Sequence, residues 1–186
     1  MNLYCNHQGG ARLPQLPQSD RKIGKRISHL YIAEVETPTK LKTEQVLLTT
    51  PDYDWERVDF WVNEGPAMMK ADGKIFVTYS ASATGECYCM GMMSVPQDAD
   101  LLDPRAWTKE RYPVLQTDAE YGLFGPGHNT FFTDEYGKLV TSYYARPYDE
   151  IIGDPLYDIN RHTYLMDVPV ENGRPVFSYE NNRINP

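Results

Sequence analysis

Positive charge is scarce in this sequence. Lys and Arg number 18 against 26 Asp and Glu, which gives the 186 residues a formal net charge of −8. Nucleic acids and anionic membrane surfaces both select clustered cations. The one basic cluster, within residues 21–26, is short and contains Gly24, so a solvated loop explains it better. We therefore expect neither nucleic acid nor a membrane as a partner.

Long apolar runs and a targeting signal are missing too. No run approaches the roughly 20 residues that span a bilayer, and residues 1–5 do not open a charged-then-apolar signal peptide. We expect a cytoplasmic protein, or a chain whose true N-terminus is missing. There are three cysteines, an odd number. Cys87 and Cys89 alternate along an expected strand, so both point to one face, and we predict reduced thiols packed as small apolar groups.

Aromatic and turn-forming residues are abundant instead. The chain has 14 Tyr, 6 Phe and 3 Trp together with 13 Gly and 14 Pro, and 41% of its residues are hydrophobic. Few stretches keep the apolar spacing of a helix. This composition favours an all-β fold with many short strands joined by tight turns.

The chain also repeats itself. Residues 64–69 align with residues 128–133, and the alignment continues without a gap from 73–79 onto 137–143. Each copy consists of a strand, a polar turn with Gly and Lys, and a second strand. Third strand-like segments follow at 88–93 and 162–167, and an earlier copy stands at 30–35. Repeats of about four strands, longer than the roughly 40–50 residues of common propeller families, predict β-propeller blades with long loops. An ordinary β-sandwich is the structural alternative.

The repeat predicts a single, partial propeller domain spanning residues 1–186. Residues 2–5 resemble the second strand of a blade, so the chain is expected to begin in mid-blade. A polar insertion would cover 6–28, the blades 29–178 and a tail 179–186. Two nearly complete blades and part of a third fall short of the at least four that typically close a propeller. Uncovered blade faces would then lead to self-association, or to pairing with a chain that carries the missing blades.

Glu64 and His128 occupy equivalent places in the aligned repeats, just before the expected first strand of each blade. The first strand of a propeller blade is innermost, so both side chains would lie at the mouth of the central channel. Different polar residues at equivalent positions favour a site, because concave mouths are where sites form. The alternative is that Glu64 ends a loop in solvent and that His128 caps a turn.

The sequence around these residues resembles glycoside hydrolase family 43, and more narrowly its α-L-arabinofuranosidase and β-xylosidase-like members. The similarity runs from about residue 30 to residue 177, and the order and spacing of the fragments make it specific. The matching fragments are residues 51–56, 61–66, 77–82, 101–108, 124–129, 144–146 and 160–163.

The resemblance implies a five-bladed β-propeller, here only its C-terminal part, with an inverting mechanism. In such enzymes a carboxylic acid protonates the leaving oxygen, while a carboxylate about 6.5–9.5 Å away activates water from the other face. Glu64 falls on the general acid of the family. The aspartate that serves as general base would precede Met1, so we expect the chain as given to lack its base and to be inactive alone.

Further roles follow from the same resemblance. His128 falls on a channel histidine that binds calcium, directly or through water, in many members. Arg161 falls on an arginine that contacts the sugar. Trp61 and Phe124 offer apolar faces to a sugar ring, although ordinary packing explains each one singly as well. Tyr144 stands where the family often has His, a departure that could weaken the site.

The resemblance thus predicts hydrolysis of arabinofuranosides or xylosides in plant-type polysaccharides or oligosaccharides. One alternative is a carbohydrate-binding remnant that keeps the sugar-facing wall but cannot activate water. The other is a propeller that binds proteins and no sugar.

Overall fold

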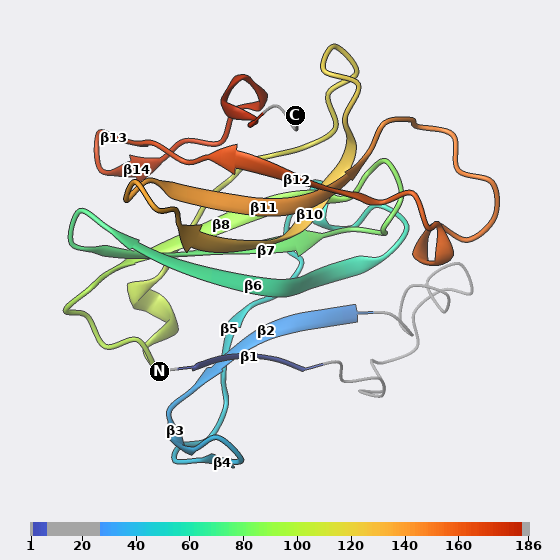
Figure 1. The fold of residues 1–186 in the computed structure, drawn as a ribbon. Coiled ribbons are helices and arrows are strands. Elements are labelled where there is room, and N and C mark those ends of the chain that lie inside the picture. The colour runs from blue at the N-terminus through green and yellow to red at the C-terminus, as the bar shows by residue number, and fades with distance from the viewer. Residues whose placement is uncertain (1, 7–26, 184–186) are drawn as a thin grey trace, which may run out of the picture.

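The computed structural model describes residues 2–6 and 27–183, and its regular structure consists of strands and short 3₁₀-helices (Figure 1). Within these ranges no helix is long and apolar enough to cross a membrane. The all-β expectation is confirmed. Most of the expected insertion at 6–28 lies outside the described residues, but residue 6 ends one strand and residues 27–28 begin another.

The described residues contain fourteen strands and four short 3₁₀-helices. The 3₁₀-helices are η2 (Asp54–Glu56), η3 (Pro104–Ala106), η4 (Pro155–Tyr157) and η5 (Tyr179–Asn181). The strands are β1 (Asn2–Asn6), β2 (Ile27–Ala33), β3 (Val35–Thr37), β4 (Lys40–Leu41), β5 (Val46–Thr49), β6 (Trp61–Ala71), β7 (Lys74–Ala81), β8 (Cys89–Pro96), β9 (Thr108–Lys109), β10 (Phe124–Thr133), β11 (Leu139–Arg146), β12 (His162–Asp167), β13 (Val170–Glu171) and β14 (Arg174–Pro175).

The strands form successive antiparallel meanders, as the repeat predicts. β6, β7, β8 and β9 follow one another as neighbours, and β10, β11 and β12 form the next sheet. Ahead of them, β2 pairs antiparallel with both β1 and β5. A short parallel pairing, Ile27 with Trp61 and Ser28 with Val62, joins β2 to β6. β1 therefore takes the place expected for residues 2–5, beside the strand expected near residue 30.

Two hairpins of different turn length open the complete meanders. Between β6 and β7 the turn is Asp72-Gly73, and both residues have positive φ, 45° and 72°. Such a two-residue turn matches the twist of the flanking strands. Between β10 and β11 the turn has more residues, and the Asp134 carboxylate accepts hydrogen bonds from the N–H groups of Tyr136 and Lys138. This turn holds one residue more than the repeat alignment assigns to it. As a result, β10 lies one residue out of step with β6 in that alignment.

This shift corrects the expected equivalence of Glu64 and His128. Glu64 pairs with Ser80, whereas in the next meander the partner of Tyr144 is Gly127. His128 therefore corresponds to Gly65, and both have left-handed backbones, with φ of 52° and 55°, in a β-bulge. The structure also places Glu64 inside β6 and His128 inside β10, whereas each was expected just before a strand. A bulge re-aims side chains next to it, which suits a site.

The apolar cores lie between the meanders. In the first meander (β1, β2 and β5), Leu30, Ile32 and Leu48 pack on Val77 and Tyr79 of the second meander (β6–β9). A second cluster, built around Phe76 and Met92 with Phe131 against it, joins the second meander to the third. Phe76 and Tyr143 are buried as expected for blade faces, whereas Met68 is exposed. Adjacent blades thus cover one another through apolar side chains.

Three local expectations differ from the structure. Cys87 lies in a turn before β8 instead of in a strand with Cys89, although both cysteines are free thiols as predicted. Among the described residues the β10–β12 sheet has three strands where the repeat predicts about four, and residues 170–175 pair within their own hairpin, β13 with β14. The segment 179–183 is not a loose tail, because Tyr179 is buried in a core cluster and the Arg183 N–H donates to the Leu165 carbonyl.

Candidate active site

Glu64 lies on β6 beside the bulge, partly buried, and a tyrosine holds its carboxylate. The Tyr88 hydroxyl donates a hydrogen bond of 2.8 Å to Oε1 of Glu64. Tyr88 is almost fully buried, and this burial, with the nearby Glu64 charge, raises the pKa of its phenol well above the usual range. The phenol therefore stays protonated at neutral pH and acts as a donor to Glu64.

Arg161, just ahead of β12, lies close to the same tyrosine. Its guanidinium carbon is 5.5 Å from the ring centroid of Tyr88 and 5.5 Å from that of Tyr144. Stacking on aromatic faces holds a guanidinium while leaving N–H groups free to bind a ligand. Nε of Arg161 is buried, and among the described residues it has no hydrogen-bond partner.

His128 lines a pocket beside Glu64. The pocket has a volume of about 310 Å³, and Gly65, Pro66, Asn129, Thr130, Ser142, Tyr143, Tyr144 and Thr163 line it with His128. The exposed imidazole lies 6.3 Å from the Tyr144 ring, centroid to centroid. A Cβ atom on Gly65 would come within 3.2 Å of Nδ1 of His128. Glycine at position 65 therefore serves both the left-handed backbone and the close approach of the histidine.

The structure thus gathers three of the five predicted site residues. Glu64 and Arg161 meet through Tyr88, and His128 joins them through Gly65 and Tyr144. No sequence pattern predicted a role for Tyr88. Tyr144, by contrast, stands out in the sequence as a departure from the family pattern.

The two predicted sugar-stacking residues have other neighbours. The guanidinium of Arg57 lies 4.6 Å from the centroid of the Trp61 ring, so a cation covers a face expected to meet a sugar. Phe124 begins β10 and pairs with Arg146 across the strands. Their role in stacking on a sugar ring stays a prediction.

A calcium ion at His128 also stays a prediction. Calcium takes about six to eight oxygen ligands. Over residues 2–6 and 27–183, no three His, Cys, Asp or Glu side chains come together in a way that could hold a metal ion. Asn129 is committed elsewhere, since its side chain bonds to Thr78 and Thr141. These residues do not fit a calcium ion coordinated mainly by protein, and we assign the ion no step.

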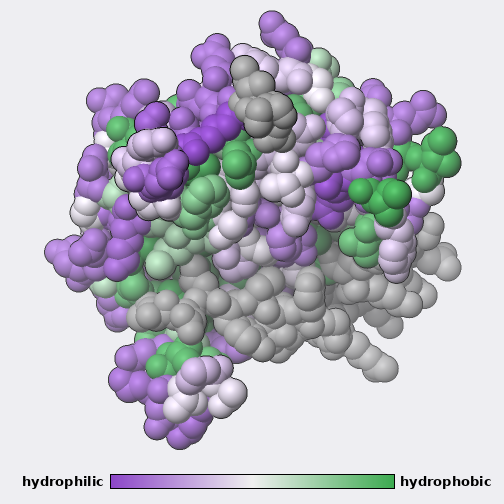
Figure 2. All heavy atoms as spheres, in the orientation of Figure 1, coloured by the Kyte–Doolittle hydropathy of each residue, from purple (hydrophilic) through white to green (hydrophobic). Residues whose placement is uncertain are grey.

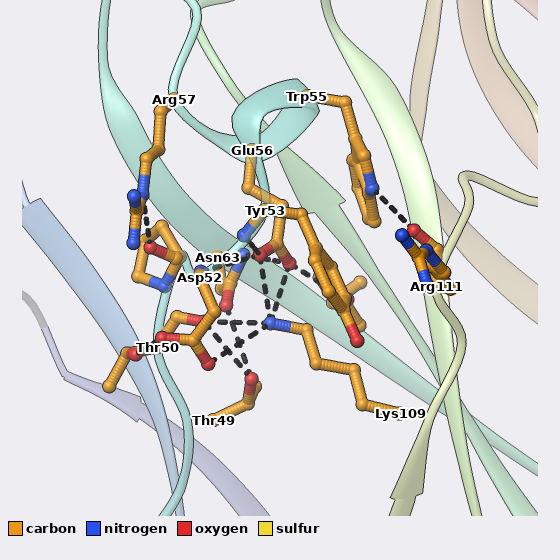
Figure 3. Close-up of polar contacts among 12 residues, drawn as sticks. Thr49, Thr50, Asp52, Tyr53, Trp55, Glu56, Arg57, Asn63, Lys109 and Arg111 are labelled. Carbon is orange, nitrogen blue, oxygen red and sulfur yellow. Dashed lines mark hydrogen bonds and ion pairs between the residues drawn. The ribbon is translucent and has the colours of Figure 1, made fainter.

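A second carboxylate, Glu56 of η2, is fully buried and lies within a group of polar side chains (Figure 3). Oε2 accepts hydrogen bonds from the N–H groups of Asp52 and Tyr53, and Nζ of Lys109 lies 2.8 Å from the carboxylate. Oε1 accepts further bonds from Asn63 and Tyr79. With both oxygens occupied, Glu56 is suited to holding the structure and not to transferring a proton.

This network bears on the site through Asn63, the residue before Glu64. Asn63 is buried, and its Nδ2 donates to Glu56 at 3.0 Å. The backbone carbonyl oxygen of Asn63 accepts a hydrogen bond from the Ser28 hydroxyl, and this bond anchors β6 to β2. No local pattern singles out Glu56 beyond its place in a family-like fragment, because its Lys109 partner is distant in the chain.

A buried arginine fixes the loop that leads to Arg161. Arg146 is 1% exposed, and its Nε donates to the Asp158 carboxylate at 2.6 Å. Its other nitrogens donate to the carbonyls of Thr84 and Pro155, so it ties the loop at 147–161 to the loop that carries Tyr88. Apolar side chains gather on the outside of this loop, at the right of Figure 2, where Ile152 and Ile159 are over 90% exposed. An ionic clamp, and not apolar burial, holds the loop in place.

The clamp predicts a pH dependence. The N–H of Asn160 and the side chains of Arg146 and Tyr148 hold the pKa of Asp158 at about 2. A carboxyl whose folded pKa is depressed stabilises the fold above its unfolded pKa of about 3.9, and this contribution is lost as the pH falls towards the folded value. Replacing Asp158 by Asn should lower the melting temperature by a constant amount above about pH 5.

Below about pH 4 the difference between the wild type and the Asp158→Asn variant should shrink, and differential scanning fluorimetry from about pH 7 to pH 2.5 follows it. The control is Asp100→Asn, which removes an exposed carboxylate that accepts a hydrogen bond from the Leu102 N–H and forms no ion pair among the described residues. A gap between Asp158→Asn and wild type that is unchanged down to pH 2.5 would contradict the ionic clamp.

A family model and several known proteins match this chain. The family model described as glycosyl hydrolases family 43 matches residues 12–175. Alpha-L-arabinofuranosidase 43 of Humicola insolens is 41% identical over 158 residues, which are 84% of this chain and 33% of that protein. An extracellular exo-alpha-(1->5)-L-arabinofuranosidase of Streptomyces chartreusis is 44% identical over 140 residues, 75% of this chain and 41% of that protein.

Solved structures give the fold. The crystal structure of an α-L-arabinofuranosidase from Lactobacillus brevis has a TM-score of 0.79 and 51% identity, and the match covers 81% of this chain and 47% of that one. The chain therefore spans less than half the length of these relatives. The meanders are blades of a five-bladed β-propeller, of which the chain forms a part. The alternative of an ordinary β-sandwich is therefore wrong. The chain belongs to glycoside hydrolase family 43.

Proposed function

We propose that this chain supplies the acid-catalyst side of an inverting α-L-arabinofuranosidase site. The observation that carries the proposal is the position of Glu64, at a bulge beside the pocket with a phenol donating to only one of its oxygens. The names of the relatives, α-L-arabinofuranosidase and exo-alpha-(1->5)-L-arabinofuranosidase, favour a terminal arabinofuranose over xylose as the sugar. Arabinose-containing polysaccharides and oligosaccharides are then the substrates.

Each group has a defined part in this reaction. Protonated Glu64 gives its proton to the glycosidic oxygen as the bond from that oxygen to the anomeric carbon breaks, and the alcohol leaves. Water attacks the anomeric carbon from the opposite face and loses a proton to a general base, so the configuration inverts. The Arg161 guanidinium, stacked between two rings, is placed to bind sugar hydroxyls. His128 forms part of the wall of the pocket.

The general base is the part that we do not assign within this chain. The described carboxylates with defined partners, such as Glu56 and Asp158, are held by buried donors and are unsuited to activating water. Loss of a positioned acid or base costs about 10²–10⁴-fold in rate. The chain alone should therefore hydrolyse arabinofuranosides negligibly.

The experiment replaces the activated water by a nucleophile that needs no base. Purified chain is incubated with 4-nitrophenyl α-L-arabinofuranoside, with and without sodium azide, and products are followed by absorbance and NMR. We expect hardly any release in water, and with azide an arabinofuranosyl azide of inverted configuration together with 4-nitrophenol. Azide supplies the electron pair for the new C–N bond, and the leaving oxygen takes its proton from Glu64.

Three outcomes would overturn this proposal. Fast hydrolysis without azide would place a working base within the chain. Binding of arabino-oligosaccharides, measured by calorimetry, with no azide product would instead support the non-catalytic carbohydrate-binding alternative. A chain that neither binds nor reacts with arabinofuranosides would leave only the protein-binding alternative.

A further inference from the structure

We infer that Tyr88 is a positioning residue that fixes the catalytic proton of Glu64 on Oε2. The inference rests on the proposed role of Glu64 as the acid. It follows from a chain of hydrogen bonds that starts in the neighbouring blade and ends on Oε1 of Glu64.

The relay runs in one direction. The backbone N–H of His128 donates to Oγ of Ser80 at 2.7 Å. The Ser80 hydroxyl also interacts with the Tyr88 phenol, and because the phenol directs its single proton at Glu64, the serine is the donor between the two hydroxyls. Tyr88 in turn donates to Oε1 of Glu64 at 2.8 Å. Each hydroxyl accepts one bond and passes its single proton onward.

The direction of the relay decides where the proton of Glu64 resides. The phenol has one O–H, and that proton is directed at Oε1. A neutral carboxyl group carries one proton, and the oxygen that accepts from Tyr88 is then the carbonyl oxygen. The proton must sit on Oε2, which is left for the leaving oxygen of the substrate. Without the phenol, the proton could occupy either oxygen, and part of the acid would face the wrong way.

The packing around Tyr88 shows that its position is built into the fold. Its side chain is 1% exposed. A Cβ atom on Gly127 would lie 2.2 Å from Cε1 of Tyr88, so glycine at that position of β10 makes room for the ring. On its other side the Arg161 guanidinium lies 5.5 Å from the ring centroid. Two blades and the β11–β12 loop therefore hold the phenol against Glu64.

A second tyrosine–glutamate pair in the same blade provides a matched comparison. The hydroxyl of Tyr79 donates to Glu56 at 2.9 Å, and this phenol is also fully buried. The carboxylate of Glu56 has donors on both oxygens, whereas the described contacts of Glu64 occupy Oε1 alone. Tyr79→Phe thus removes the same kind of bond without touching the candidate acid.

The first measurement does not depend on activity. In a mixture of light and heavy water, a slowly exchanging tyrosine hydroxyl splits the NMR signal of its own Cζ carbon. We expect this splitting for Tyr88 in the wild type, assigned by its loss in Tyr88→Phe, and a collapsed signal in Ser80→Ala, where the relay is broken. A single, unsplit Tyr88 signal in the wild type would overturn the relay.

The second measurement uses the azide reaction with two leaving groups. Tyr88→Phe should react about tenfold more slowly than wild type with α-1,5-arabinobiose, whose alcohol needs a proton to leave. With 2,4-dinitrophenyl α-L-arabinofuranoside, which needs none, the loss should stay below about twofold. Tyr79→Phe should change both rates by the same factor.

The outcomes separate the inference from the proposed function. Equal losses in Tyr88→Phe on both substrates would reduce Tyr88 to a structural residue and overturn the inference. A wild-type chain that reacts with neither substrate would overturn the proposed function, and the isotope splitting then decides alone whether the relay exists.

Discussion

Replacing Lys109 by Met is expected to lower the free energy of unfolding by about 3–5 kcal/mol. The side chain of Lys109 is 14% exposed and that of Glu56 is fully buried, so the ammonium group neutralises a carboxylate that water does not reach. Removing one partner of a buried ion pair leaves an uncompensated charge, which costs more than the pair itself contributes. Urea unfolding followed by tryptophan fluorescence measures the change.

Two variants check the cause of this loss. Lys42→Met breaks an exposed pair, in which the lysine and Glu34 side chains are 58% and 40% exposed, and should cost less than about 1 kcal/mol. Lys109→Arg keeps a positive charge beside the Glu56 carboxylate and should lose less stability than Lys109→Met. A single Lys109→Met variant that loses no more than Lys42→Met would show that the pair is not a buried charge pair.

The strand pattern of this chain could be predicted because it depends on neighbours in the sequence. The polar turn with Gly73 and Lys74 located the β6–β7 hairpin, and the repeat located β10 and β11. The one-residue error between Glu64 and His128 has a physical origin. The β10–β11 turn holds one residue more than a gapless alignment allows, and both first strands carry the same bulge, so the sequence alone does not reveal the one-residue offset.

The candidate site was only partly predictable, for a related reason. Glu64, His128 and Arg161 carry family-like surroundings along the chain, so resemblance located them. Tyr88 acts through Ser80 and through the space left by Gly127, and these contacts come from three different strands or loops. Tertiary contacts of this kind have no local signature. The same holds for Glu56, whose Lys109 partner is 53 residues away.

Replacing Glu64 by Gln should slow the azide reaction with α-1,5-arabinobiose by about 10²–10⁴-fold, the usual contribution of a positioned acid. The amide keeps the shape of the carboxyl group, and its oxygen can still accept the bond from Tyr88, but it has no proton acidic enough to transfer. With the 2,4-dinitrophenyl arabinofuranoside the loss should fall to a few-fold, because this leaving group departs as a stable anion.

Glu36→Gln is the matched control for that variant, because Glu36 forms an exposed ion pair with Lys40 on the β3–β4 hairpin, away from the pocket. It should leave both rates unchanged. Unchanged urea midpoints for Glu64→Gln would show that the loss is chemical, since the fold is then intact. Equal losses on both substrates would mean that Glu64 binds the sugar or supports the pocket, and that the acid must be sought elsewhere. A loss much larger for arabinobiose than for the dinitrophenyl arabinofuranoside identifies proton transfer, because both substrates carry the same arabinofuranosyl group and only the sugar alcohol needs a proton to leave.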